Sequence, residues 1–220
     1  MIQQIIKSFL PPEIILLTRF AQDTSQSIKR RYVGSYLFNQ LSSSTNLKLE
    51  FGSGSRRGTS GWTTVDMVPG ADIEWNLLNP VPLAPNSVDM IYSSHLLEHL
   101  SYKEIINVLN DWFRILKPTG KLMVCVPDSS HYLTAYHNPD TIQKFIPDFY
   151  QPAFNYHTPI DYLNYIAYMD GNHKHLFDQQ NLHEILKSVG FVNIKERPFD
   201  PSLDSKGHDW ESIYAEAEKP

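Results

Sequence analysis

A glycine-containing segment, Glu50 to Gly54, has the composition of a ligand-binding loop. It follows an apolar run, and glycines at positions 52 and 54 would let the chain turn sharply off a strand and bring its backbone close to a ligand. A dinucleotide-binding loop would have glycine or alanine at position 57, where this chain has Arg57. The segment therefore predicts a small-molecule site and disfavours a nicotinamide cofactor.

Asp66 ends the short apolar run Trp62–Val65 and is the next candidate for ligand binding. A carboxylate at the tip of the second strand of a parallel sheet can accept hydrogen bonds from both ribose hydroxyls of an adenosine ligand. The alternative is a turn-forming Asp before Met67 and Pro69. Together with the glycine segment, Asp66 favours a nucleoside-containing ligand.

The segment His95 to His99 (HLLEH) matches the inverted zincin pattern, in which two histidines bind zinc and a glutamate acts as base. His95 follows the apolar run Val88–Tyr92 directly, whereas the next helix is expected to begin only at Ser101, so the two histidines are not expected to share a helix face. We therefore expect no metal. His99 is expected to form a structural hydrogen bond.

The composition limits the class of protein. The chain has 220 residues, 41% of them apolar, which suits one domain over residues 1–220. Its single cysteine, Cys125, excludes an internal disulfide and a cysteine-rich zinc finger. A net charge of −5 gives no support to a nucleic-acid partner. No apolar run has the length of a membrane span and the N-terminus lacks signal-peptide features, so we expect a cytoplasmic protein.

The hydrophobic pattern predicts alternating strands and helices. Seven runs are typical of strands: Leu47–Phe51, Trp62–Val65, Ala71–Trp75, Val88–Tyr92, Lys121–Val126, Phe191–Arg197 and Ser212–Glu218. A helix is expected over Ser101–Leu116, with a capping box at its start and a closing turn over 117–120. A second helix is expected over Asp178–Val189, ending at Gly190. This alternation favours an α/β fold with a parallel sheet.

The N-terminal residues 1–44 are predicted to form a helical cap. Residues 1–40 have a net charge of +3, and Ile28, Tyr32 and Tyr36 recur at every fourth position, which indicates an amphipathic helix. Packing on the main domain is one interpretation. Peripheral contact with an anionic membrane, or with an acidic substrate, is the other.

Five fragments, in this order along the chain, resemble class I S-adenosylmethionine-dependent methyltransferases. They are EFGSG (50–54), GWTTVD (61–66), PLAPNSVD (82–89), SSHLLEH (93–99) and LKPTGKL (116–122), and the likeness resumes at HKHLF (173–177) and SIYAEA (212–217). The resemblance implies S-adenosyl-L-methionine as cofactor and a doubly wound, mostly parallel seven-stranded sheet with an antiparallel C-terminal strand. It is closest to the small branch of predicted methyltransferases often associated with cell-surface glycan or small-metabolite pathways.

The resemblance also assigns roles to single positions. The implied cofactor-binding set is Glu50, Gly52, Gly54, Asp66, Met67, Asn76 and Ser94. The first three would form the loop facing the methionine part, Asp66 would bind the ribose and Met67 the adenine. Asn76 stands where the family commonly has an acid, and its amide oxygen can accept the same bond. Arg56 replaces the usual third glycine. In this family the residues just past the fourth strand lie beside the transferred methyl group, which implies that His95 is the general base or, alternatively, that it only positions cofactor or substrate.

Residues 129–172 are predicted to be an insertion that forms a lid over the acceptor. They lack periodicity, and residues 129–175 hold seven tyrosines and five histidines, which suit a polyhydroxylated or ring-containing acceptor unless they form a buried aromatic cluster. Asp128, His131 and Tyr132 are the predicted substrate residues. We therefore expect O-methylation of a small metabolite, sugar or glycan. A cofactor-binding module without catalysis and a nicotinamide-dependent oxidoreductase are the alternatives.

Overall fold

The computed structural model describes residues 12–55, 61–138 and 158–220, with side chains described from residue 24. Seven strands form one sheet of order β3-β2-β1-β4-β5-β7-β6. The strands are β1 (Lys48–Phe51), β2 (Trp62–Asp66), β3 (Ile73–Glu74), β4 (Val88–Ser94), β5 (Leu116–Pro127), β6 (Val192–Glu196) and β7 (Ser212–Glu218). β7 is antiparallel to both of its neighbours, and the other pairs are parallel. The predicted fold class is confirmed.

Each of the seven predicted strands has a counterpart in this sheet, with changed ends. β3 is reduced to two residues, and β4 continues to Ser94. The turn expected over residues 117–120 lies instead inside β5, because a shift in register between β4 and β5 absorbs it. Val88 pairs with Leu116, but Met90 pairs with Lys121.

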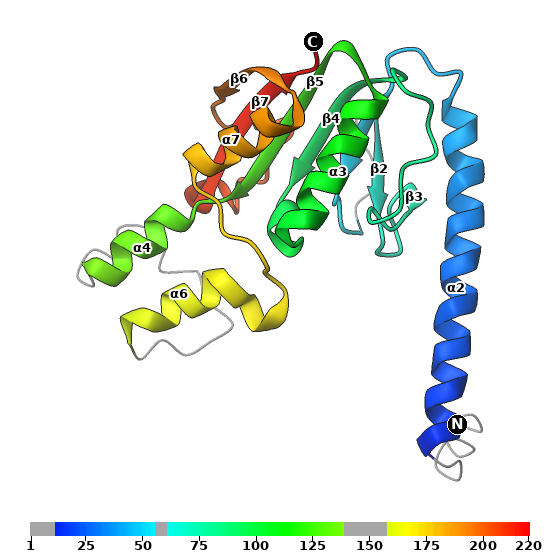
Figure 1. The fold of residues 1–220 in the computed structure, drawn as a ribbon, viewed down its shortest axis with the longest axis horizontal. Coiled ribbons are helices and arrows are strands. Elements are labelled where there is room, and N and C mark those ends of the chain that lie inside the picture. Colours follow the sequence, from blue (N-terminus) through cyan, green and yellow to red (C-terminus); the bar gives the residue numbers. More distant parts are fainter. Residues whose placement is uncertain (1–11, 56–60, 139–157) are drawn as a thin grey trace.

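Helices α3 (Tyr102–Ile115) and α7 (Gln179–Val189) pack side by side on the sheet (Figure 1). The predicted capping box is present, since the Glu104 carboxylate accepts a hydrogen bond from the Ser101 N–H at 2.8 Å. The buried stripe of α3 has helical spacing and comprises Ile105, Val108, Leu109, Trp112 and Ile115. Burying each large side chain of this kind contributes about 1.5–3 kcal/mol.

Helix α2 (Pro12–Leu41) runs along the β3 edge of the sheet and extends well beyond it (Figure 1). Its predicted apolar side is exposed, with 65% of Ile28, 79% of Tyr32 and 60% of Tyr36 accessible. The helix instead packs through its C-terminal part. Phe38 is buried against Trp75, and a Cβ on Gly34 would come within 2.8 Å of the same indole. The helix is confirmed, whereas its role as a cap stays a prediction.

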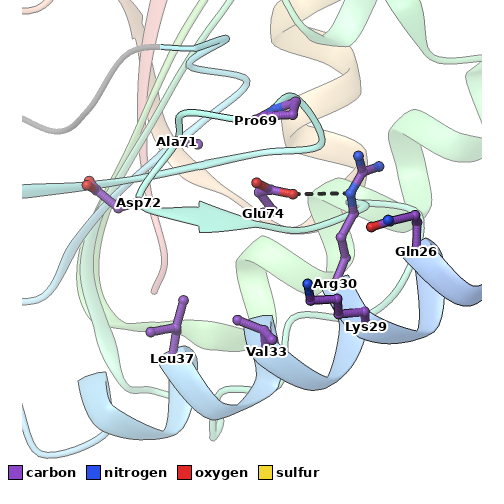
Figure 2. A pocket seen from close by; sticks show the side chains of 9 residues that line it. All are labelled: Gln26, Lys29, Arg30, Val33, Leu37, Pro69, Ala71, Asp72 and Glu74. Carbon is purple, nitrogen blue, oxygen red and sulfur yellow. Dashed lines mark ion pairs between the residues drawn. The ribbon is translucent and has the colours of Figure 1, made fainter. Parts of the chain in front are cut away.

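A groove of about 360 Å³ lies between α2 and β3. Figure 2 shows its walls, with Arg30 Nε 3.1 Å from Glu74 Oε2 across it. Because both side chains are more than a third exposed, this ion pair contributes at most about 1 kcal/mol. Within the described part of the chain, no helix combines the length and apolarity needed to cross a bilayer.

Two further helices, α4 (Ser129–His137) and α6 (Pro159–Tyr168), pack against each other below the carboxyl end of the sheet (Figure 1). Their contact forms a second apolar cluster around Tyr132, Tyr165 and Ile166. Tyr136 and Tyr168 of the same helices are exposed. The tyrosines of this region therefore divide between a buried aromatic cluster and an accessible surface.

Candidate active site

The glycine segment and Asp66 meet at the carboxyl ends of β1 and β2. Gly52 and Gly54 both have positive φ angles, of 79° and 65°, which glycine adopts readily. The Asp66 carboxylate accepts hydrogen bonds from the Gly54 N–H at 2.8 Å and the Val68 N–H at 2.9 Å. The loop and the carboxylate thus hold each other in place.

Asp66, Met67 and Asn76 line a single cavity of about 310 Å³. Its walls also contain Leu96 and His99 from the segment after β4. Three predicted cofactor residues are therefore brought together at one place, next to the HLLEH segment.

The two remaining cofactor candidates, Glu50 and Ser94, lie on adjacent strands. Phe51, which ends β1, is opposite Ser93 of β4, and the two candidates are the chain neighbours of these residues. The side chains of Glu50 and Ser94 are therefore near the carboxyl ends of their strands, and both are half-buried. Arg56 and Arg57, the departures from glycine in the loop, lie outside the described residues.

His95 follows β4 in a left-handed backbone conformation, with a φ of 50°. Its ring nitrogen Nε2 is 2.8 Å from Ser212 Oγ, and that hydroxyl donates its proton to the His208 carbonyl at 2.6 Å. His95 Nε2 must therefore be the donor, and Nδ1 carries the lone pair. Burial lowers the pKa of His95 to about 4, so the ring is neutral near neutral pH.

Glu98 lies three residues on, in the short 3₁₀ helix η1 (Leu97–His99). Its side chain is only 2% exposed, and its Oε2 has no hydrogen-bond partner among the described residues. Burial raises the pKa of this carboxyl to about 8. A buried carboxyl oxygen without a hydrogen-bond donor is costly and marks a candidate functional group.

Histidines from distant parts of the chain complete the site. A cavity of about 230 Å³ is lined by His95, Glu98, His99, Pro127, Tyr165, Ile166, Met169, His173, His208 and Glu211. The rings pair, with 4.6 Å between the His95 and His208 centroids and 5.0 Å between those of His99 and His173. His208 Nδ1 lies 2.8 Å from the Glu211 carboxylate, which raises the pKa of His208.

The three predicted substrate residues lie beside or behind this cavity and are not among its lining residues. Asp128 caps α4 by accepting a hydrogen bond from the Ser130 N–H, and its carboxylate is 3.5 Å from His131 Nε2. Tyr132 is 1% exposed and donates its hydroxyl proton to Glu211 at 3.2 Å. Tyr132 is thus a support for Glu211.

His208 and Glu211 were not among the residues predicted from the sequence. His208 precedes the 3₁₀ helix η4 (Asp209–Glu211) and Glu211 ends it, in a segment with no periodicity or known motif. The one signal in the sequence is that His208 and Glu211 are three positions apart just before strand β7, and this spacing is too common to be specific. His173 was noted only as part of a family likeness.

Comparisons with known proteins bear on this geometry. The profile of a family described as "Methyltransferase domain" matches residues 21–196. No curated protein matches. A solved S-adenosylmethionine-dependent methyltransferase from Archaeoglobus fulgidus is similar at 14% identity, over 86% of this chain and 94% of that chain, with a TM-score of 0.50. That likeness shows the fold alone.

A second similar structure is the 1,6-didemethyltoxoflavin-N1-methyltransferase of Burkholderia thailandensis, at 13% identity over 96% of this chain and 91% of that chain, with a TM-score of 0.48. The family profile covers most of the chain, and the strand order and ordered motifs agree with it. The chain therefore belongs to the methyltransferase-domain family, as a class I methyltransferase that uses S-adenosylmethionine.

Proposed function

We propose that the protein methylates a hydroxyl oxygen of a small metabolite or sugar. The observation that carries this proposal is the position of His99, which is part of the wall of two cavities. One is lined by the cofactor candidates Asp66, Met67 and Asn76, and the other by imidazole and carboxylate groups. Donor and acceptor would then occupy neighbouring cavities at the carboxyl edge of the sheet.

The cofactor cavity fits an adenosine group in its chemistry. Each oxygen of the Asp66 carboxylate accepts one backbone hydrogen bond and keeps a further lone pair, so the pair can still receive two ribose hydroxyls. Met67 and Leu96 offer apolar surface for a base. S-adenosylmethionine supplies an already activated methyl group, so the protein has to align the acceptor, exclude water and remove a proton.

His95 is the proposed proton acceptor. Its neutral ring and its Nδ1 lone pair are available at neutral pH, because burial keeps the pKa near 4. A base of such low pKa accepts a proton weakly. The Glu98 carboxyl lies 3.5 Å from Nδ1 and, in its ionised form, would stabilise the imidazolium once it forms.

The acceptor class follows from the lining of the second cavity. Imidazoles and the Glu211 carboxylate can exchange hydrogen bonds with several hydroxyl groups, while Tyr165, Ile166 and Met169 provide apolar contact. These last residues belong to the predicted lid over 129–172. Asp128, His131 and Tyr132 would act from behind the wall, with Tyr132 holding Glu211. This mixture suits a small polyhydroxylated acceptor or the end of a glycan.

Two measurements test the proposal. S-adenosylhomocysteine is expected to raise the melting temperature by mass action, whereas NAD is not. Incubation with S-adenosylmethionine and fractionated metabolites should then yield a product in which one methyl group has replaced a hydrogen. This product should resist mild acid, as a methyl ether does. Stabilisation without any methylated product would favour a binding module, and a product methylated on nitrogen would contradict the oxygen acceptor.

A further inference from the structure

Three nitrogen lone pairs surround the Glu98 carboxyl. His99 Nδ1 is 3.0 Å from the Asn172 carbonyl, and His173 Nδ1 is 2.7 Å from the Ile166 carbonyl. Since a carbonyl can only accept, both rings carry their proton on Nδ1, and each Nε2 holds a lone pair. The Nδ1 lone pair of His95 also lies on this side, 3.5 Å from Glu98 Oε1.

A carboxyl oxygen that faces only nitrogen lone pairs is stabilised by a positive charge. Glu98 Oε2 is buried without a hydrogen-bond partner among the described residues, and His99 Nε2 is 3.9 Å from Glu98 Oε1. Separations of 3.5–3.9 Å are too long for hydrogen bonds and leave space between the atoms. One proton could satisfy only one of these contacts, whereas a metal ion could satisfy several.

The geometry of the group suits a metal ion. One ligand atom from each of Glu98, His99 and His173 lies within 4.8 Å of the others. Two imidazoles and one carboxylate, with open positions left over, form a known ligand set of catalytic zinc. The carbonyls of Asn172 and Ile166 orient the two rings as outer partners do around bound metals.

We propose that Glu98, His99 and His173 bind a divalent transition-metal ion of the Zn²⁺ type. This proposal departs from the expectation of no metal that the sequence favoured. The two histidines of the HLLEH segment do not act as a pair, because His95 turns toward Ser212 while His99 meets His173 from a separate segment. The open positions of the ion would face the histidine-lined cavity.

A second group, His95, His208 and Glu211, also has ligand atoms within 4.8 Å of one another, but it suits a metal less well. His208 already forms a close ion pair with Glu211, and its side chain is 52% exposed. His95 Nε2 is engaged with Ser212. In the first group Glu98 and His173 are buried and His99 is half-buried, both rings are held by backbone carbonyls, and Glu98 has an oxygen without a hydrogen-bond partner among the described residues.

Such an ion would bind the acceptor oxygen in the adjoining cavity and lower the pKa of that hydroxyl. This role rests on the proposed function, whereas metal binding itself does not. Binding is therefore measured without S-adenosylmethionine or acceptor, so a failure of either proposal can be recognised separately.

The test uses the full chain without an affinity tag, dialysed against a chelator and then equilibrated with Zn²⁺. We expect one tightly bound ion per chain and a higher melting temperature. His99→Gln and His173→Gln should each weaken binding by about tenfold or more. His183→Gln is the matched control, because His183 lies on α7 and contacts Gln179 outside the cluster. It should bind like the unaltered chain.

Failure of the unaltered chain to retain Zn²⁺ would overturn the proposal, as would equal retention by the His99 and His173 variants. Loss in His208→Gln with retention in His173→Gln would also overturn it, by assigning the ion to the second group. Co²⁺ supplies a measurement that needs no variant. An intense visible spectrum of a four- or five-coordinate ion is expected, and the weak spectrum of aqueous Co²⁺ would contradict the site.

Discussion

The carboxyl edge of the sheet has two halves, named here for their proposed roles: a cofactor half around Gly52, Gly54 and Asp66, and an acceptor half around His95 and Glu98. The two halves are assembled in different ways. In the cofactor half, Gly52 and Asp66 are 14 positions apart; Gly52 follows β1, Asp66 ends the neighbouring strand β2, and the Gly52 N–H donates to the Val65 carbonyl. In the acceptor half, His95 contacts Ser212, which is 117 positions away. The first half depends on a short chain segment, whereas the second exists only once the whole sheet and its flanking helices have formed.

The two halves also differ in how their carboxylates are satisfied. Asp66 accepts two backbone N–H groups, so its charge is stabilised before any ligand binds. Glu98 is buried among nitrogen lone pairs. The cofactor half is thus a preformed acceptor of hydroxyl groups, while the acceptor half is left in need of a proton or a cation.

The largest expected effect separates the halves by activity. His95→Ala should reduce turnover by about 10²–10⁴-fold because it removes the proposed proton acceptor. Binding of S-adenosylhomocysteine should stay unchanged, as measured by calorimetry. Full turnover in this variant would show that the base assignment is wrong.

Asp66→Ala should weaken the binding of S-adenosylhomocysteine, which His95→Ala leaves unchanged. Loss of hydrogen bonds to a charged group typically costs about 1.5–3 kcal/mol, so affinity for S-adenosylhomocysteine should fall by about 10–100-fold. The affinity is measured by titrating S-adenosylhomocysteine and following the melting temperature, and circular dichroism checks the fold. His95→Ala is the control variant, in which the rise in melting temperature should be kept. Undiminished affinity would remove Asp66 from the cofactor site.

The contact between Gly52 and Leu96 joins the halves and offers a matched pair of variants. A Cβ on Gly52 would lie 2.7 Å from Leu96 Cβ, whereas one on Gly54 would meet nothing within 4 Å. Both positions have positive φ, so Gly54→Ala should cost about 1 kcal/mol of unfolding free energy and Gly52→Ala about 2–3 kcal/mol. Chemical denaturation measures both. Equal losses would mean that Leu96 moves aside freely.

The last expected effect concerns the pH dependence of stability in the acceptor half. The folded-state pKa of His95 is lowered to about 4 from its ordinary 6.5, so its contribution to stability is present above pH 6.5 and is lost as the pH falls toward 4. The unaltered chain should lose about 2 kcal/mol relative to His95→Gln over that interval. Chemical denaturation at several pH values measures the unfolding free energy of both chains. An equal change in that free energy between pH 6.5 and 4 would contradict this prediction.

Much of the fold and of the cofactor half was readable from the sequence. The strand predicted over Val88–Tyr92 and the helix predicted over Ser101–Leu116 are local patterns of apolar residues, and the structure has them at Val88–Ser94 and Tyr102–Ile115. The family resemblance implied the order of the sheet. It also implied that Met67 and Asn76 lie with Asp66, as fits the edge that the carboxyl ends of parallel strands share.

The exposed side of α2 could not be predicted in this way. Ile28, Tyr32 and Tyr36 have the spacing of a buried stripe, but burial depends on what the helix meets, and Trp75 meets Gly34 and Phe38 instead. Periodicity shows which residues share a side of a helix. It does not show which side finds a partner.

The sequence by itself determined the chain's class and, through the family resemblance, its sheet. It also determined the loop and carboxylate of the cofactor half, which depend on residues close together in the chain. Only the tertiary structure decided the acceptor half. The proton positions on His99 and His173 depend on the carbonyls of Asn172 and Ile166, and the cavity beside Glu98 is lined by segments from position 95 to position 211. Glu98 and His99 belong to one short motif, but His173 meets them only because folding brings distant segments together and removes water from their polar groups.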